Sequence, residues 1–168
     1  MRKTLLPALA AASLSLCAAS AQAAGVVHVN PAKSFISKAV VVPAGSDTLY
    51  VSGITPQPAD PAKPTELGDT KAQAASILSQ IAAILKDQGY AMEDVVMMRV
   101  YLAGDPAKGG KMDFGGMMES YKAVYDPLPN KPARVTVQVA ALVAPTMLCE
   151  IEVQAAKAPE KPAAKPKK

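Results

Sequence analysis

Hydrophobic and polar residues alternate along several short stretches of the chain, whereas two longer stretches repeat their hydrophobic residues every three or four positions. Alternation is typical of a β-strand with one buried face, and the longer spacing is typical of an amphipathic helix. These patterns predict two strands within 38–54, a helix from about 69 to 88, a strand at 95–104, a second helix at 113–125, and strands at 133–141 and 147–156.

The two strands within 38–54 are rich in Val, Leu and Tyr and are separated by the turn-forming residues 43–47. We therefore expect them to form a β-hairpin. Four prolines follow in 55–67, which excludes a helix there and predicts an extended loop. Asp69 is the expected N-cap of the first helix, and Gly89 is expected to end it.

The predicted element order is β-β-α-β-α-β-β, which is typical of an α+β fold. Because each helix has one apolar face, we expect both helices to pack on the same face of a sheet. No internal repeat is present. The 145 residues from Ala24 onward are enough for one compact domain, and we expect a single domain at 24–156.

The first 23 residues have the features of a cleaved signal peptide. A basic start at residues 1–3 precedes an apolar stretch, and the small-x-small pattern at 21–23 suits signal peptidase. We expect cleavage after Ala23 and a periplasmic or secreted protein. Cys17 leaves a lipoprotein alternative open, although Leu16 stands where a small residue is preferred.

Charge is distributed unevenly between the expected domain and the C-terminal segment. Residues 24–156 hold 11 basic and 13 acidic side chains, a net charge of about −2, whereas 157–168 hold five Lys and one Glu. The domain's charge gives no reason to expect a nucleic-acid partner. The Lys-, Pro- and Ala-rich tail is expected to be disordered, and either to contact anionic envelope surfaces or to remain solvated.

Several kinds of catalytic and metal site are excluded by the residues present. No H-E-x-x-H, G-x-S-x-G, phosphate-loop or G-x-G-x-x-G motif occurs. The single histidine, His28, is expected in a flexible arm, and no metal site is predicted. After cleavage only Cys149 remains, so no intramolecular disulfide is expected.

The strongest candidates for chemistry are Arg134 in "PARVTVQ" and the pair Glu150 and Glu152 in "CEIEVQ". The planar guanidinium of Arg can bind a carboxylate through two parallel hydrogen bonds. Alternation places Arg134, Thr136 and Gln138 on one face of their strand. That polar row is either a solvated face or the lining of a cleft, and the two glutamates could simply pair with Arg99 or with lysines.

A set of motifs in a fixed order resembles the RidA/YjgF reactive-intermediate deaminases, also known as liver perchloric-acid-soluble-type endoribonucleases. The resemblance covers nearly all of 37–156, and P-A-R followed downstream by E-I-E is its most specific part. The matching segments are "SKAVVV", "LYVSG", "AQAASILSQIAAILKDQGY", "EDVVMMRVYL", "DFGGMMESYKAVY", "PARVTV" and "CEIEVQAA".

This resemblance implies a chorismate-mutase-like α+β fold that forms a homotrimeric barrel with ligand clefts between neighbouring subunits. It implies hydrolysis of small 2-imino or enamine acids to 2-keto acids and ammonia, without a metal or an organic cofactor. Carried onto this sequence, it implies that Arg134 grips the substrate carboxylate and that Glu150 positions the attacking water. Ser52 and Gly53 match the wall of the cleft.

Some positions depart from the family pattern. Ile36 replaces a Tyr whose hydroxyl faces the cleft, Met118 stands at a position that is commonly Asn, Thr136 replaces a Cys or Ser, and Lys131 replaces an aromatic residue. The loop at 103–112 is longer than usual. All of these except Lys131 and the loop are expected substrate-binding positions.

Three other functions stay open beside the deaminase. The protein could be a trimeric small-carboxylate-binding protein of the cell envelope without turnover, or a structural trimer in which Arg134 holds subunits together. A ribonuclease is the least favoured, because the expected domain is slightly acidic and has neither a basic, aromatic stripe nor a pair of histidines.

Overall fold

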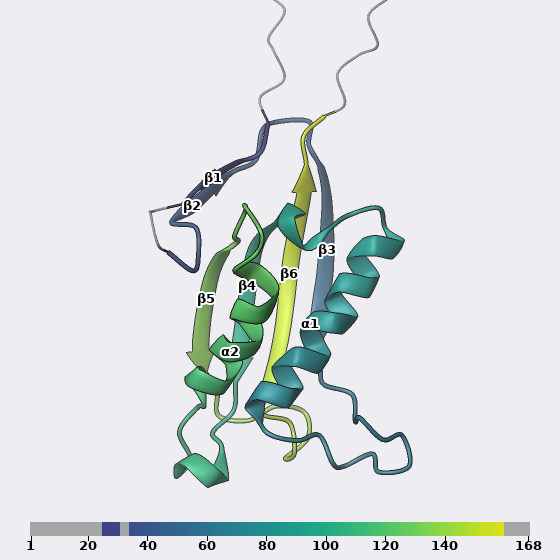
Figure 1. Cartoon of the computed structure of the whole chain (residues 1–168), viewed down its shortest axis with the longest axis vertical. Coiled ribbons are helices and arrows are strands. Elements are labelled where there is room, and N and C mark those ends of the chain that lie inside the picture. Colours follow the sequence, from purple (N-terminus) through teal and green to yellow (C-terminus); the bar gives the residue numbers. More distant parts are fainter. Residues whose placement is uncertain (1–24, 31–33, 160–168) are drawn as a thin grey trace, which may run out of the picture.

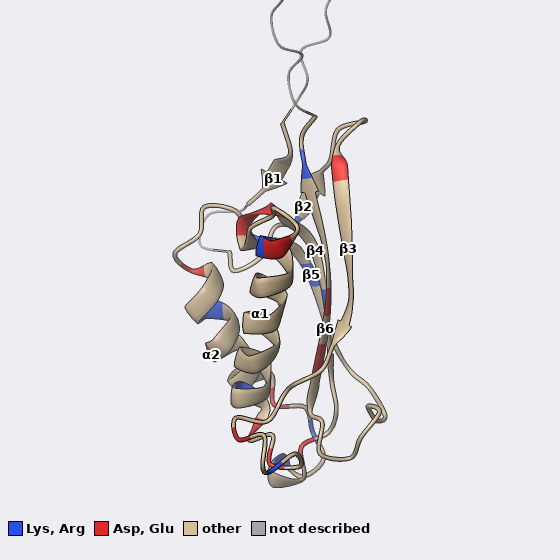
Figure 2. Cartoon of the chain, turned by 90° about the vertical axis from the view of Figure 1, so that its right-hand side faces the viewer, with Lys and Arg blue, Asp and Glu red and all other residues tan. Residues whose placement is uncertain are grey.

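The computed structural model describes residues 25–30 and 34–159, which form a layer of strands covered on one side by two helices (Figures 1 and 2). Short 3-10 helices lie at Met92–Asp94 and Pro106–Lys108. The other elements are β1 Val27–Val29, β2 Ala39–Val41, β3 Asp47–Ile54, α1 Thr70–Asp87, β4 Val95–Leu102, α2 Phe114–Tyr125, β5 Ala133–Gln138 and β6 Cys149–Lys157.

The main sheet has the strand order β3-β6-β4-β5. Strand β6 runs antiparallel to both of its neighbours, whereas β4 and β5 are parallel. The view along the sheet shows α1 and α2 on the same side of it (Figure 2). The predicted α+β class, with both helices on one face of a sheet, is therefore confirmed.

The predicted hairpin within 38–54 is wrong, although both of its strands exist. Strand β2 pairs with β1 in a separate two-stranded sheet, and β3 pairs with β6. Residues 42–46 form the connection, and they carry the chain from one sheet to the other instead of folding it back on itself. Local sequence predicted the two strands but contained no information about their distant partners.

His28 lies in β1, so the expectation of a flexible arm at this residue is also wrong. Its ring Nδ1 lies 2.8 Å from the carbonyl oxygen of Lys131, just before β5. The hydroxyl of Ser37 donates a hydrogen bond to the same carbonyl at 2.5 Å. These contacts fasten the two-stranded sheet to the edge of the main sheet.

Both helices begin where the sequence predicts. The Asp69 carboxylate accepts a hydrogen bond from the Ala72 N–H at 2.8 Å, and Asp113 accepts one from the Gly116 N–H at 3.1 Å. Each bond satisfies a backbone donor that has no partner within its own helix. Gly89 follows α1 with a φ of 77°, a left-handed conformation that glycine adopts without strain.

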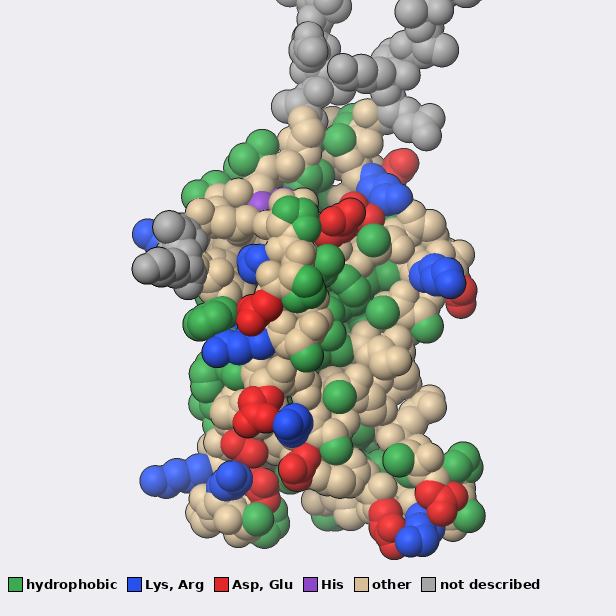
Figure 3. All heavy atoms as spheres, in the orientation of Figure 1, with side chains coloured by type: hydrophobic (Ala, Val, Ile, Leu, Met, Phe, Trp, Pro, Cys, Tyr) green, Lys and Arg blue, Asp and Glu red, His purple; other side chains and the backbone are tan. Residues whose placement is uncertain are grey.

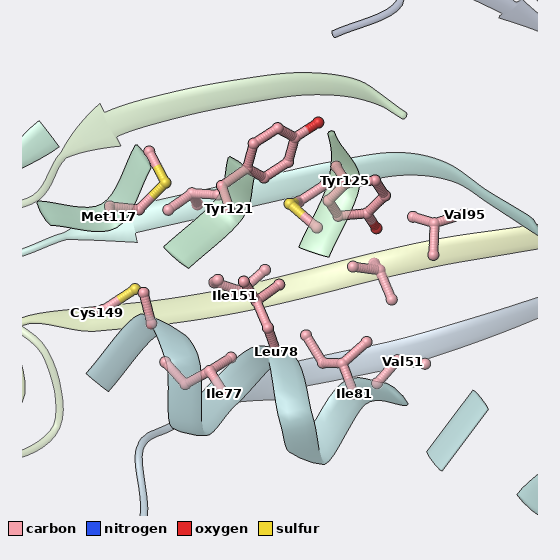
Figure 4. Close-up of a cluster of buried hydrophobic side chains, with 14 of the residues drawn as sticks. Val51, Ile77, Leu78, Ile81, Val95, Met117, Tyr121, Tyr125, Cys149 and Ile151 are labelled. Carbon is pink, nitrogen blue, oxygen red and sulfur yellow. The ribbon is translucent and has the colours of Figure 1, made fainter. Parts of the chain in front are cut away.

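The core lies between the sheet and the two helices (Figure 4). Helix α1 contributes Ile77, Leu78 and Ile81, and Tyr121 and Tyr125 of α2 stack with their ring centroids 4.6 Å apart. Burial raises the pKa of the Cys149 thiol to about 12. This thiol therefore stays protonated at neutral pH and packs as a small apolar side chain.

Residues 1–24 and 160–168 lie outside the described part, so the expected signal peptide and most of the tail stay predictions. Lys157, which the sequence predicts to lie in the tail, is instead the last residue of β6. Within the described ranges, no helix is both long and apolar enough to cross a membrane.

Candidate functional site

Arg134 lies on the helix-covered face of the sheet. In the parallel register it aligns with Met98 of β4, and Thr136 aligns with Val100, and both β4 residues are completely buried beneath the helices. Val135 and Val137 point to the opposite face, where each is 40% exposed. The polar row of β5 thus faces the helices, and its valines lie on the face that carries no helix.

The Arg134 guanidinium is held against α2. Its central carbon lies 4.2 Å from the centroid of the Tyr121 ring, and Nη2 lies 3.1 Å from the sulfur of Met118. Nη1 is buried and has no hydrogen-bond partner among residues 25–30 and 34–159. A buried N–H donor without an acceptor is costly, and an anion that accepts from this half-buried cation would remove the cost.

No carboxylate among residues 25–30 and 34–159 forms an ion pair with Arg134. Burial raises the pKa of Tyr121 to about 12, so the ring stacked on the guanidinium is a neutral phenol. Burial also lowers the pKa of Arg134, since leaving water disfavours the charged form. Arginine nevertheless stays charged at neutral pH because its ordinary pKa is so high.

A pocket of about 490 Å³ opens beside this guanidinium, and we call it the Arg134 pocket. Its walls are mainly apolar, and both phenylalanines of the chain line it, with 45% of Phe35 and 44% of Phe114 exposed. The lining residues are Ser34, Phe35, Ile36, Phe114, Gly115, Met118, Glu119, Lys122 and Arg134.

Hydrogen bonds hold the backbone at or near both aromatic walls. Tyr121 donates from its hydroxyl to the carbonyl oxygen of Phe35 at 2.8 Å. Gln138 holds the long loop before Phe114, because its amide nitrogen donates to the Gly110 carbonyl and its amide oxygen accepts from the Met112 N–H, both at 2.9 Å. The pocket therefore has a fixed shape on both sides.

Two charged side chains at the pocket are already engaged. The Lys122 ammonium lies 4.2 Å from the centroid of the Phe35 ring, a cation–π contact. Glu119 forms an exposed ion pair with Lys71 at 2.6 Å. Figure 3 shows this helix-bearing face, on which acidic and basic side chains are intermixed. Arg134 also contacts an aromatic ring, that of Tyr121, but it has no ion pair among the described residues and its Nη1 has no hydrogen-bond acceptor there.

Glu150 lies on the other face of the sheet, in β6. It aligns with Tyr101 of β4, and two residue pairs further along, Arg99 forms an ion pair with Glu152 at 2.8 Å. Tyr101 donates a hydrogen bond to the same Glu152 oxygen at 3.3 Å. Glu152 therefore pairs with Arg99, which is one of the alternatives expected from the sequence. Glu150, by contrast, forms no ion pair in the described part of the chain.

The Glu150 carboxylate lies over Gly53, at an irregularity in the pairing of β3 with β6. A Cβ built on Gly53 would lie 2.0 Å from Glu150 Oε1, so a larger residue would collide with the carboxylate. Ser52 lines a small hollow beside Glu152 on this same face. Gly53 thus leaves the space that the Glu150 side chain fills.

The residues selected from the sequence therefore form two groups in one chain. Ile36 and Met118 join Arg134 at its pocket, whereas Ser52 and Gly53 lie with Glu150 across the sheet. The Thr136 hydroxyl is buried on the Arg134 face and has no hydrogen-bond partner among the described residues. Lys131 is engaged locally and donates to the Leu128 carbonyl at 2.5 Å.

Sequence reasoning missed Phe35, Phe114, Tyr121 and Lys122 as neighbours of Arg134. The sequence contains one signal for the two phenylalanines, which are the only ones in the chain. Phe35 stands next to Ile36, and Phe114 lies in the motif "DFGGMMESYKAVY" together with Met118. Among the described residues, no group of three or more His, Cys, Asp or Glu side chains is arranged to hold a metal ion.

Comparison with known proteins points to one family. A RutC family protein of Pyrococcus horikoshii is 38% identical over 111 residues, which cover 65% of this chain and 79% of the relative. A Rid family protein from Yersinia pestis, named YyfB and of unknown function, has a structure with a TM-score of 0.60 and 25% identity, covering 77% of this chain and 97% of that one.

Escherichia coli TdcF, solved with bound serine, is 30% identical with a TM-score of 0.53, and the match covers 67% of this chain and 81% of that one. The family model described as Endoribonuclease L-PSP matches residues 19–157, most of the sequence. The chain therefore belongs to the Endoribonuclease L-PSP family, the group that includes the RidA/YjgF and RutC proteins.

Proposed function

We propose that this protein binds small 2-imino or enamine acids through Arg134 and hydrolyses them to 2-keto acids and ammonia. The observation that carries the proposal is the buried Nη1 of Arg134, which has no partner among the described residues, in a guanidinium that lies over a neutral ring. A carboxylate supplies both the missing charge and the missing acceptors. The serine bound to the related TdcF also carries a carboxylate.

In the proposed reaction Arg134 binds the substrate and Glu150 activates water. Arg134 holds the carboxylate and thereby fixes the adjacent imine carbon in place. Glu150 accepts a proton from water as the water oxygen forms a bond to that carbon, and the C–N bond then breaks as protonated nitrogen leaves as ammonia. One imino acid and one water give one keto acid and one ammonia. The scheme uses no metal and no organic cofactor.

We further propose that the complete site forms between two copies of the chain in a homotrimer. Arg134 and Glu150 lie on opposite faces of one sheet, so a single chain does not bring both to one small ligand. The helix-free face also exposes Val135, Val137 and Tyr50, with Tyr50 71% exposed. A neighbouring copy packed on this face would bury these side chains and bring its pocket to Glu150.

The test is an ammonia-release assay on 2-iminopropanoate generated in place by an amino-acid oxidase. The wild-type protein should accelerate ammonia release, Arg134→Ala should abolish the acceleration, and Glu150→Gln should lower it about 100-fold. Val143→Ala, at a side chain that is 83% exposed and outside the Arg134 pocket, is the matched control and should keep the wild-type rate. A wild-type rate equal to the uncatalysed one would reject the deaminase.

Mixing subunits tests the shared site. When Arg134→Ala and Glu150→Gln chains are unfolded together and refolded, random trimers should recover about a quarter of the wild-type activity, because some sites then combine an intact Arg134 with an intact Glu150. Sizing by light scattering should show a trimer for both variants. If the mixture stays as inactive as its components, each site belongs to one chain and the shared arrangement is wrong.

Ile36 favours a second function, a carboxylate-binding protein without turnover. It presents an aliphatic side chain to the Arg134 pocket, where the family resemblance places a tyrosine hydroxyl. In that case pyruvate would raise the melting temperature of the wild type but not of Arg134→Ala, while the ammonia assay would show no acceleration. The two readouts together separate the binding protein from the enzyme.

A further inference from the structure

We propose that the Arg134 pocket selects acids with a bulky apolar or aromatic side chain over acids as small as pyruvate. This inference rests on the proposed function, because it assumes that Arg134 holds the carboxylate of the ligand. It concerns the rest of that ligand, which must lie against the remaining walls of the pocket.

The volume and the chemistry of the walls both favour a large apolar group. At about 490 Å³ the pocket lies within the range of sites that enclose molecules much larger than a three-carbon acid. Phe35, Ile36, Phe114 and Met118 supply four apolar side chains around the guanidinium. A methyl group would leave most of this surface in contact with water, whereas a phenyl or branched aliphatic group would cover it.

The aromatic walls are also prepared for such a group before it binds. The Phe35 backbone is held by the Tyr121 hydroxyl, and its ring is held by Lys122. Phe114 directly follows the N-cap Asp113 at the start of α2, so its backbone is fixed as well. Both rings nevertheless stay nearly half exposed. The Phe35 ring, already held by Lys122, should lose little conformational entropy on binding, and the flat faces of both rings suit an aromatic ligand.

The charged lining residues do not favour a second acidic group on the ligand. Lys122 is engaged by the Phe35 ring, and Glu119 contributes a carboxylate to the same lining. Its partner Lys71 lies outside the lining. A ligand with one carboxylate at Arg134 and an apolar remainder therefore fits this arrangement better than a dicarboxylate.

Calorimetric titration of the full-length protein with pyruvate, 4-methyl-2-oxopentanoate and phenylpyruvate tests the inference. Phenylpyruvate should bind about 10- to 100-fold more tightly than pyruvate, with the branched acid between them, because each added apolar group covers more of the walls. Phe114→Ala should reduce the ratio of phenylpyruvate to pyruvate affinity by about 10-fold. Val143→Ala, the distant exposed control, should keep the ratio.

The outcomes separate this inference from the function on which it rests. Pyruvate binding as tightly as phenylpyruvate, with both lost in Arg134→Ala, would overturn the side-chain preference and leave the carboxylate site standing. An unchanged affinity ratio in Phe114→Ala would also overturn the preference, provided circular dichroism shows that the variant is folded. If none of the three acids binds, the carboxylate site itself is wrong and the preference falls with it.

Discussion

Arg134→Met is expected to remove all carboxylate-dependent stabilisation and, at the same time, to make the ligand-free protein more stable. We expect the free energy of unfolding to rise by about 1 kcal/mol, which corresponds to a melting temperature higher by about 2–4 °C for a chain of this length. The same variant should show no shift in melting temperature with any 2-keto acid. The measurement is thermal unfolding with and without ligand.

The reason is that partial burial of the charged Arg134 side chain costs desolvation free energy. Arg134 is half-buried and gains no carboxylate in the described part of the chain, and its fully buried Nη1 makes no hydrogen bond there. The contact with Tyr121 recovers part of the loss, because a cation–π contact contributes about 0.5–2 kcal/mol. Methionine keeps an unbranched apolar stem against Tyr121 and Met118 and carries no charge to desolvate.

Arg99→Met is the matched comparison, because Arg99 lies on the next strand and has a partner. Its ion pair with Glu152 is 2.8 Å long, so removing the guanidinium leaves that glutamate without its counter-ion. We expect this variant to be slightly less stable than the wild type, with ligand binding retained. If Arg134→Met instead lost stability or its trimeric state, Arg134 would be a structural interface residue, as one sequence hypothesis suggested.

Local features of the sequence predicted most of the elements because the determinants of those elements are local. The helix α1 begins after Asp69 because that carboxylate caps it, and both the capping residue and the apolar spacing are visible in the sequence. Strand partners are different. Neither the pairing of β2 with β1 nor that of β3 with β6 is encoded in the residues between the strands, so the nearest pairing was the wrong one.

The position of Arg134 likewise depends on distant parts of the chain that local sequence does not specify. Alternation predicted that Arg134 and Thr136 share a face, and the register agrees, but it could not say which face the helices cover. Valines usually turn toward a core, yet here Val135 and Val137 are the exposed residues. What decides the matter is Tyr121 on α2, which stacks on the guanidinium from the helix layer.

The separation of Arg134 from Glu150 also depends on the order of strands. Strand β4 lies between the strands that carry them, and the two side chains project from opposite faces. No spacing along the chain contains this information. This arrangement is the reason for proposing that the deaminase site, which uses both residues, is shared between two copies of the chain, whereas a carboxylate pocket alone would need only one.

Gly53→Ala is expected to reduce the proposed deaminase turnover about 100-fold while leaving stability nearly unchanged. The added Cβ would lie 2.0 Å from Glu150 Oε1 and 3.0 Å from its Cδ, so the carboxylate must move. Because those atoms end a flexible side chain, rotation of Glu150 can relieve the clash without moving the backbone. The free energy of unfolding should therefore change by no more than about 0.5 kcal/mol.

Two other glycines separate this effect from a general loss of fold. A Cβ on Gly25 meets nothing within 4 Å, so Gly25→Ala should keep both turnover and stability. A Cβ on Gly104 would lie 2.4 Å from the Gly110 carbonyl oxygen, which is backbone, so Gly104→Ala should lower the melting temperature. Steady-state kinetics and thermal unfolding of the three variants supply both measurements.

The kinetic pattern of Gly53→Ala then identifies what Glu150 does. If Glu150 acts on the water, the loss should fall on kcat, and 2-keto acid binding through Arg134 should be retained. If Glu150 only shapes the cleft, KM should rise while kcat is kept. Wild-type kcat in a variant whose crystal structure shows Glu150 displaced would contradict the assignment of Glu150 to the chemistry. That result would leave Arg134 as the carboxylate ligand and require another group to activate the water.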